Sequence, residues 1–197
     1  SFLSYRVFGS SVVVLGDPVG PYQEIEGLLN SFHQVCQEKN KGLCFFQASS
    51  SLLDIYKRLG FHVSVIANEG LVNLSSFNLQ ESGRVKLREQ MKKLDTFRYR
   101  VRYYKNTTDK QVLEKLRKVP DEWLSRGQVE KVFALGSFSE EYMKATTVMT
   151  VEDMVGNVVA FINPTPSYKK NDIAVDLMRA SHKSPEAALD YLLTHAI

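Results

Sequence analysis

Cysteine is scarce in this chain of 197 residues, and long apolar runs are absent from it. Its two cysteines, Cys36 and Cys44, are too few for the disulfide framework of a small secreted domain, and we expect both to be buried, reduced thiols of a cytosolic protein. The four histidines form no ligand spacing with them, which argues against a zinc site. No stretch approaches the roughly 18 apolar residues of a membrane span. No signal-peptide pattern opens the chain. Because the chain begins at Ser1 and not at Met, we expect a fragment or a processed form.

The overall composition is ordinary for a globular protein, but the charged residues are distributed unevenly along the chain. The hydrophobic fraction of 44% can form the core of one sizeable domain or of two smaller lobes. The net charge is only +3, but a basic block runs from Arg84 to Lys105 with only Glu89 and Asp95 against it. Its candidate members for binding the phosphates of a tRNA or another anion are Arg84, Lys86, Arg88, Arg98, Arg100 and Arg102. A solvated helix face is the alternative interpretation.

The first lobe, residues 1–108, is expected to alternate strands and helices. Hydrophobic periodicity and turn residues predict a hairpin over 5–15, a helix over 22–38, a strand over 43–46, a helix over 51–59, strands over 61–66 and 71–74, a helix over 82–94 and a strand over 97–104. Asp17 lies in a loop stiffened by glycine and proline, which either lines a cleft or forms a plain turn. The last strand places Arg98, Arg100 and Arg102 on one face, which either binds an anion or protects a sheet edge.

The second lobe, residues 109–197, is expected to follow the helix-capping sequence 106–109. The predicted elements are helices over 110–118, 120–124 and 140–144, strands over 146–151 and 158–163, a proline-containing loop over 164–167, a strand over 173–175 and a helix over 185–195 capped by Ser184. Further strands that would complete such a lobe do not follow. We therefore expect the second lobe to be incomplete at its C-terminus.

One short stretch carries the strongest candidates for chemistry. The β-branched or small residues of Ile173–Val175 suit a buried strand, and Asp176 and Arg179 follow at its predicted end. Side chains at strand ends in α/β sheets face the crevice where ligands bind, which favours a catalytic pair. Spacing alone favours the structural alternative, in which the two side chains pair with each other or cap the next segment.

Several motifs resemble those of known families. Tyr56-Lys57-Arg58-Leu59-Gly60-Phe61 resembles the end of the fourth helix in GNAT-type N-acetyltransferases. A longer series is similar, in the same order, to the aminoacyl-phosphatidylglycerol synthases, the lysyl- or alanyl-phosphatidylglycerol transferases called multiple peptide resistance factors. The series consists of Gly16-Asp17-Pro18-Val19-Gly20, Phe77-Asn78-Leu79 followed by Leu87-Arg88, Asp121-Glu122-Trp123-Leu124, Leu135-Gly136-Ser137-Phe138 and Val175-Asp176-Leu177-Met178-Arg179.

This resemblance implies an α/β (α+β) fold of two tandem GNAT-like lobes with mixed central sheets, at the cytoplasmic face of a bacterial membrane. It implies transfer of lysine or alanine from aminoacyl-tRNA to the headgroup hydroxyl of phosphatidylglycerol, with resistance to cationic antimicrobial peptides as the consequence and with no metal or other cofactor. Asp176 and Arg179 match the family's functionally important aspartate and arginine. Asp17, Glu69 and Ser137 are the candidate substrate-binding residues, although the loop around Glu69 is less acidic than is usual in the family.

Alternative functions stay open on the sequence. An acyl-CoA acetyltransferase is disfavoured, and CoA is not expected, because no glycine follows Arg179 to build a pyrophosphate cradle. A tRNA-dependent transferase with a sterol or peptide acceptor is one alternative. A non-catalytic module that binds tRNA or anionic membranes through the basic block is another. The family's lysine and acidic residues after the last helix are missing from this chain, so activity of the fragment alone is not implied.

Overall fold

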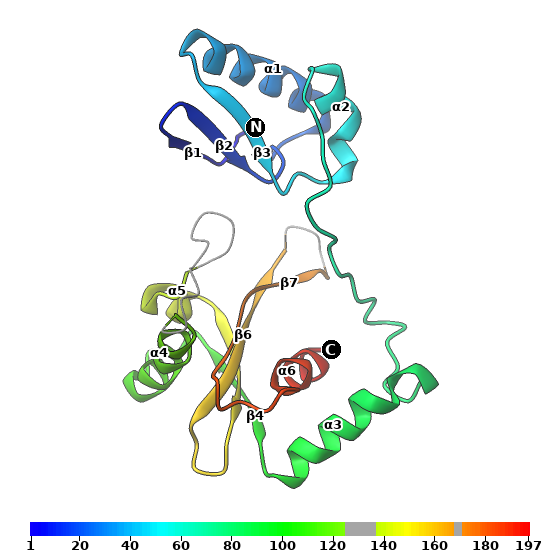
Figure 1. Ribbon diagram of the computed structural model, residues 1–197, viewed down its shortest axis with the longest axis vertical. Coiled ribbons are helices and arrows are strands. Elements are labelled where there is room, and N and C mark those ends of the chain that lie inside the picture. The colour runs from blue at the N-terminus through cyan, green and yellow to red at the C-terminus, as the bar shows by residue number, and fades with distance from the viewer. Residues whose placement is uncertain (125–136, 168–170) are drawn as a thin grey trace. The chain divides into compact units, whose positions relative to one another are not determined.

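The computed structural model describes residues 1–124, 137–167 and 171–197, with side chains from 121 to 124 excluded. The chain divides into two compact units, Ser1–Gly70 and Leu71–Ile197 (Figure 1). The expected boundary between residues 108 and 109 therefore differs from the observed division. The reason is that the strand ending at Lys105 pairs with a strand that begins at Thr147, which places it in the sheet of the second unit.

The first unit is built on a small mixed sheet of order β1-β2-β3. Strands β1 (Tyr5–Phe8) and β2 (Ser11–Leu15) form the expected hairpin, and β3 (Gly42–Phe46) pairs with β2 in parallel. A parallel pair requires a long crossover, which is supplied by α1 (Tyr22–Glu38), the helix expected over 22–38. The C-terminal ends of β2 and β3 consequently meet at one edge of this sheet.

The core of the first unit lies between its helices and the sheet. A short 3-10 helix, η1 (Ser50–Leu52), continues into α2 (Leu53–Arg58), and Gly60 follows with φ of 83° where the helix was expected to stop. The buried residues of this core are Ile25, Leu29, Leu52, Ile55 and Tyr56. The apolar stripe that predicted α1 is thus the face that it buries.

The two strands expected over 61–66 and 71–74 are wrong, because the structure has no strand in either range. Their apolar residues are largely in contact with solvent, with Val65 89% and Leu71 85% exposed. Valine and leucine at these positions suit a pleated, half-buried surface, but a strand also needs a neighbour for its backbone N–H and C=O groups. The composition of the two ranges suits a pleated surface. Among the described residues, however, no neighbouring strand pairs with their backbone.

The second unit contains an antiparallel sheet of order β4-β5-β6-β7. Its strands are β4 (Arg100–Lys105), β5 (Thr147–Glu152), β6 (Val158–Pro166) and β7 (Ile173–Ala180). Its helical elements are η2 (Ser82–Arg84), α3 (Val85–Thr96), α4 (Lys110–Leu124), α5 (Glu140–Ala145) and α6 (Ala188–Ala196). The mixed α/β fold class is therefore confirmed, although only the first of the two sheets is mixed.

Helices cover both faces of this second sheet (Figure 1). On one face α4 and α5 pack against a core that includes Leu116, Met143 and Phe161. On the other face α3 and α6 pack against a core that includes Leu94 and Leu192. From Ala160 to Ile162 the side chains of β6 alternate between the two cores, because neighbouring residues of a regular strand point to opposite faces.

Prolines were expected to interrupt a helix and a strand of the second unit, and they interrupt neither. The helix expected to end near Lys118 continues as α4 through Pro120 to Leu124, so the separate helix over 120–124 is wrong. The loop expected at Pro164 and Pro166 is the end of β6. Pairing with β5 ends at Ile162, so among the described residues both prolines have a strand neighbour on the β7 side only, and an edge of this kind tolerates a missing N–H.

The cysteines differ from expectation in one respect. Both are free thiols, but Cys36 is buried in α1 whereas Cys44 on β3 is exposed. Burial raises the pKa of the Cys36 thiol and keeps it protonated. The expectation of two buried thiols is thus wrong for Cys44, whose side chain lies on the solvent face of a small sheet.

Candidate active site

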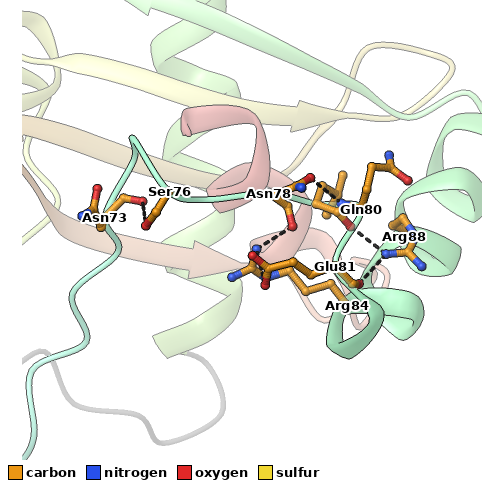
Figure 2. A network of polar contacts seen from close by, with 8 residues as sticks. Asn73, Ser76, Asn78, Gln80, Glu81, Arg84 and Arg88 are labelled. Carbon is orange, nitrogen blue, oxygen red and sulfur yellow. Dashed lines mark hydrogen bonds and ion pairs between the residues drawn. The ribbon is translucent and has the colours of Figure 1, made fainter.

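Two arginines of the basic block hold a neighbouring segment of the chain, as Figure 2 shows. The guanidinium of Arg88 donates to the carbonyl oxygens of Leu79 and Glu81 at 2.7 and 2.8 Å. Arg84 donates to the carbonyl of Asn78 at 2.6 Å, forms an ion pair with Glu81 at 3.2 Å and lies 4.3 Å from the ring centre of Phe77. These contacts give both arginines a structural role at the start of α3.

The other four candidates of the block are exposed side chains. Lys86 lies on α3, Arg100 and Arg102 lie on the edge strand β4, and Arg98 precedes that strand with φ of 60°. The strand expected from residue 97 begins only at Arg100, because the turn at Arg98 interrupts the alternating pattern. The structure therefore places two, not three, of these arginines on one strand face.

In the first unit, Asp17 connects the loop that follows β2 to the loop that follows β3. Its carboxylate accepts hydrogen bonds from the Tyr56 hydroxyl at 2.9 Å and from the Ser49 amide at 3.1 Å. Burial, together with the bond to Asp17, raises the pKa of Tyr56 far above its usual range. Asp17 thus has a clear structural role at the sheet edge where parallel strands end. Glu69 is exposed in the strandless region, and Ser137 of the second unit is half-buried.

Asp176 lies in the middle of β7, not at the end of a strand as expected, whereas Arg179 is the last residue but one of this strand. The register pairs Met178 with Ile162 and Val175 with Pro164, so that Asp176 and Leu177 together face one residue of β6. This two-against-one pairing is a β-bulge, a feature that turns a side chain out of the regular alternation. Arg179 is only 8% exposed, and its Nη1 donates to the Met178 carbonyl at 3.0 Å. The strand expected to end at Val175 continues to Ala180, because residues 178–180 pair with β6 beyond the bulge.

Tyr142, on α5, reaches the carboxylate in the bulge. Its hydroxyl donates to Oδ2 of Asp176 at 2.6 Å. Burial raises the pKa of Tyr142, and the bond to Asp176 raises it further, while the Asn163 amide acts in the opposite direction. The phenol is therefore protonated at neutral pH and remains a donor to Asp176. Ser139 caps α5 through a bond from the Tyr142 amide at 3.1 Å, which fixes where this helix begins.

Asn163 is the residue of β6 that faces the bulge. It is completely buried, and its Oδ1 accepts a hydrogen bond from the Leu177 amide at 2.6 Å. Its Nδ2 has no hydrogen-bond partner among the described residues. A buried amide donor left unpaired costs about 1–3 kcal/mol.

A hollow of about 630 Å³ lies elsewhere in the second unit, bordered by Phe97, Met154 and Pro185 among others. None of the candidate site residues lines it. Within the described parts of the chain, no group of three or more histidine, cysteine, aspartate or glutamate side chains is placed to hold a metal ion. No helix of these parts is long and apolar enough to cross a membrane.

Comparison with known proteins decides the family. The family described as "Phosphatidylglycerol lysyltransferase, C-terminal" matches residues 1–197. The chain belongs to this family. Among curated phosphatidylglycerol lysyltransferases, that of Staphylococcus epidermidis strain RP62A is 27% identical over 197 residues, 100% of this chain and 23% of the relative. That of Bacillus subtilis strain 168 is 29% identical over 192 residues, 98% of this chain and 22% of the relative.

Solved structures of the phosphatidylglycerol lysyltransferase family have the same fold. L-PGS from Bacillus licheniformis matches with a TM-score of 0.89 and 29% identity, over 98% of this chain and 59% of that one. The C-terminal domain of a putative lysylphosphatidylglycerol synthetase from Agrobacterium fabrum matches with a TM-score of 0.89 and 25% identity, over 98% of this chain and 62% of that one. The chain thus spans about a quarter of the curated lysyltransferases and about three fifths of the solved domains.

Sequence reasoning missed two residues that surround Asp176 in this family member. Asn163 directly follows the apolar run that predicted β6. A polar residue next to such a run is unusual in a buried strand, and this was the signal in the sequence that pointed to Asn163. Tyr142 has no comparable local signal. Its contact with Asp176 joins residues 34 positions apart and depends on how α5 packs on the sheet.

Proposed function

We propose that this chain is part of the catalytic domain of a tRNA-dependent lipid aminoacyltransferase. The enzyme transfers lysine, or alanine, from aminoacyl-tRNA to the headgroup hydroxyl of phosphatidylglycerol at the cytoplasmic face of the membrane. The observation that carries the proposal is the family match over the whole chain, together with relatives named phosphatidylglycerol lysyltransferase. The added positive charge on the lipid would weaken binding of cationic antimicrobial peptides.

The reaction exchanges one ester for another and needs no covalent enzyme intermediate. The lipid hydroxyl oxygen attacks the carbonyl carbon of the aminoacyl ester, and the bond from that carbon to the ribose oxygen of the tRNA breaks. The hydroxyl proton leaves the lipid, and a proton reaches the ribose oxygen. Because the aminoacyl ester is already activated, the enzyme has to position the two substrates, assist proton transfer and stabilise the oxyanion.

Asp176 is proposed as the carboxylate that orients the lipid hydroxyl or binds the α-ammonium group of the amino acid. Its place in a β-bulge and its bond with Tyr142 hold the carboxylate in one orientation. Arg179 is proposed to bind a phosphate of the tRNA end or of the lipid headgroup, since a guanidinium fork matches phosphate oxygens. Asp17, Glu69 and Ser137 remain proposed substrate-binding residues.

The exposed cations of the second unit are proposed to contact the tRNA backbone. Lys86, Arg98, Arg100 and Arg102 are exposed, so the phosphates of a large ligand can reach their charged groups. Arg84 and Arg88 would act indirectly, since their guanidinium groups hold the segment before α3. The non-catalytic alternative, tRNA or membrane binding without transfer, predicts the same contacts but no lipid product.

The decisive experiment uses the full-length protein in vesicles that contain phosphatidylglycerol. We expect lysyl-tRNA or alanyl-tRNA to yield a lipid whose mass increases by the corresponding aminoacyl group, and ribonuclease treatment to abolish the product. Aminoacylation of another added lipid or peptide instead would identify a different acceptor. Tight tRNA binding without any product would support the non-catalytic alternative.

A pair of variants tests the carboxylate. Asp176→Asn is expected to lower the turnover number by about 10²–10⁴-fold, the range for a group that assists proton transfer. Asp172→Asn makes the same change at an exposed position just before β7 and should retain full activity. Equal activity of both variants would exclude an essential carboxylate at residue 176.

A further inference from the structure

The β-bulge that contains Asp176 is closed by a side chain. Two residues of β7 face Asn163 alone, so the regular ladder cannot supply an acceptor for both of their amides. Oδ1 of Asn163 takes the place of a backbone carbonyl and accepts the Leu177 amide at 2.6 Å. A valine or isoleucine would suit a buried strand position better than asparagine, so the residue is not explained by packing.

A second contact fixes the carboxylate from another element. Tyr142 on α5 donates to Oδ2 of Asp176 at 2.6 Å, and Ser139 fixes the first turn of this helix. Asn163 is completely buried, so its contact with the bulge is shielded from water. The backbone of the bulge is thus held from β6, and the carboxylate in the bulge is held from α5.

We propose that Asn163 and Tyr142 are positioning residues for Asp176. Asn163 holds the bulge that turns Asp176 out of the regular alternation, and Tyr142 holds the carboxylate in one rotamer. Neither residue has to touch a substrate. The inference rests on the proposed function, in which Asp176 takes part in aminoacyl transfer.

The experiment measures kcat and KM of full-length variants with aminoacyl-tRNA and phosphatidylglycerol vesicles. Tyr142→Phe removes the hydroxyl that donates to Asp176, and Asn163→Val removes the acceptor for the Leu177 amide together with the unpaired Nδ2 group. Each is expected to lower kcat by about tenfold to hundredfold with little change in KM for the tRNA, because a misplacement of about 1 Å can cost two orders of magnitude in rate. Asn163→Asp, which keeps the acceptor oxygen, is expected to recover part of the kcat lost in Asn163→Val.

Matched controls separate positioning from stability. Tyr104→Phe removes a bond of the same kind, to Glu152 at 2.6 Å, and Thr150→Val removes a buried hydroxyl from the neighbouring strand β5. Both should keep wild-type kcat, even where thermal melting shows a loss of stability equal to that of the test variants. If kcat instead followed melting temperature across all of these variants, the positioning role would be overturned.

A double-mutant cycle distinguishes failure of this inference from failure of the proposed function. In the Asp176→Asn background, Tyr142→Phe should cause almost no further loss of kcat, because the two residues act together. Full activity of Asp176→Asn would contradict the catalytic role of Asp176 and the inference with it. A large loss in Asp176→Asn combined with wild-type kcat in Tyr142→Phe and Asn163→Val would overturn the positioning inference alone.

Discussion

Single side chains in the second unit join elements that lie far apart in the sequence. The Tyr104 hydroxyl donates to Glu152 at 2.6 Å, and the Tyr191 hydroxyl donates to Asp95, which links α6 to α3. Burial, together with these acidic partners, raises the pKa of both tyrosines to about 12. Each phenol is therefore a donor over the whole physiological pH range and contributes to stability there.

These tyrosines predict a loss of stability at alkaline pH. The pKa of tyrosine in the unfolded chain is about 10, so the stabilisation is complete below about pH 10 and is lost as pH rises through about 12. We expect urea unfolding to show a free energy of unfolding that falls more steeply between about pH 10 and 12 for wild type than for Tyr104→Phe. At pH 7 the variant should be less stable by about 1 kcal/mol. Parallel pH profiles would contradict the raised pKa of Tyr104.

The turn between β5 and β6 depends on one carboxylate. Asp153 accepts hydrogen bonds from the Val155 and Asn157 amides at 3.0 and 2.8 Å. Burial alone would raise the pKa of Asp153, but hydrogen bonds from Asn157 and the turn amides outweigh it and lower the pKa. A lowered pKa means stability that is present above the unfolded value near 4 and is lost as the pH falls through the folded value.

We expect Asp153→Ala to destabilise the second unit by about 1–2 kcal/mol, measured by urea unfolding at pH 7, because the turn amides lose their acceptor. Asp153→Asn keeps one acceptor oxygen and should lose less. The free energy of unfolding of Asp153→Asn should also depend less on pH between 5 and 3 than that of wild type. An equal acid dependence in the two proteins would show that this carboxylate is not stabilised by the turn.

At the scale of elements, the start of α3 is joined to the preceding segment by arginines. Arg88 binds two carbonyl oxygens and Arg84 a third, so the segment from Phe77 to Glu81 is attached to the helix without a strand or helix of its own (Figure 2). A basic block read from the sequence predicts an anion-binding surface. The structure shows that the same charge also attaches one element to the next.

Hydrogen exchange can distinguish residues of the basic block that hold the segment before α3 from residues that are available to bind an anion. Arg88→Ala is expected to speed amide exchange at Gln80 and Glu81 at least several-fold and to destabilise the unit by about 1 kcal/mol, since two charge-assisted bonds are lost. Lys86→Ala, an exposed residue two positions earlier, should leave exchange unchanged. In the proposed function, Lys86→Ala should instead weaken tRNA binding and reduce its salt dependence. Unchanged exchange in Arg88→Ala would contradict the structural role.

The whole chain consists of two units joined near Gly70. The region from His62 to Leu74 contains no strand or helix among its residues, and Val65 and Leu71 are almost fully exposed. Backbone without regular hydrogen bonds opens at low free energy and is accessible to proteases. Each of the two units is therefore a candidate to fold independently of the other.

Limited proteolysis tests this division. We expect elastase, under conditions that leave the folded units intact, to cut first between residues 62 and 74 and to leave a fragment that begins near Leu71 and ends at Ile197. Mass spectrometry of the fragments locates the cut. The boundary expected from sequence, after residue 108, would instead give a fragment that lacks β4, and accumulation of that fragment would contradict the observed division.

Sequence by itself determined the elements whose information is local. The helix over Tyr22–Glu38, the hairpin over 5–15 and the turn at Gly60 follow from the spacing of apolar residues and from glycine, and the motifs were enough to indicate the family that the comparisons confirm. Such features depend on neighbours within one or two turns of the chain. A single sequence therefore contains what is needed to predict them.

Tertiary structure decided the features that depend on a partner. In the part of the chain that the structure describes, no strand pairs with the apolar residues of 61–66, and they form no strand. Pro164 is part of β6 because the described pairing with β5 ends at Ile162 and leaves that side of the strand without a ladder to disrupt. The surroundings of Asp176 have the same origin, since its bulge needs Asn163 on another strand and its carboxylate is held by Tyr142 on another element. Contacts between distant segments exist only after the chain has packed, and for that reason the local pattern could name Asp176 but not the residues that position it.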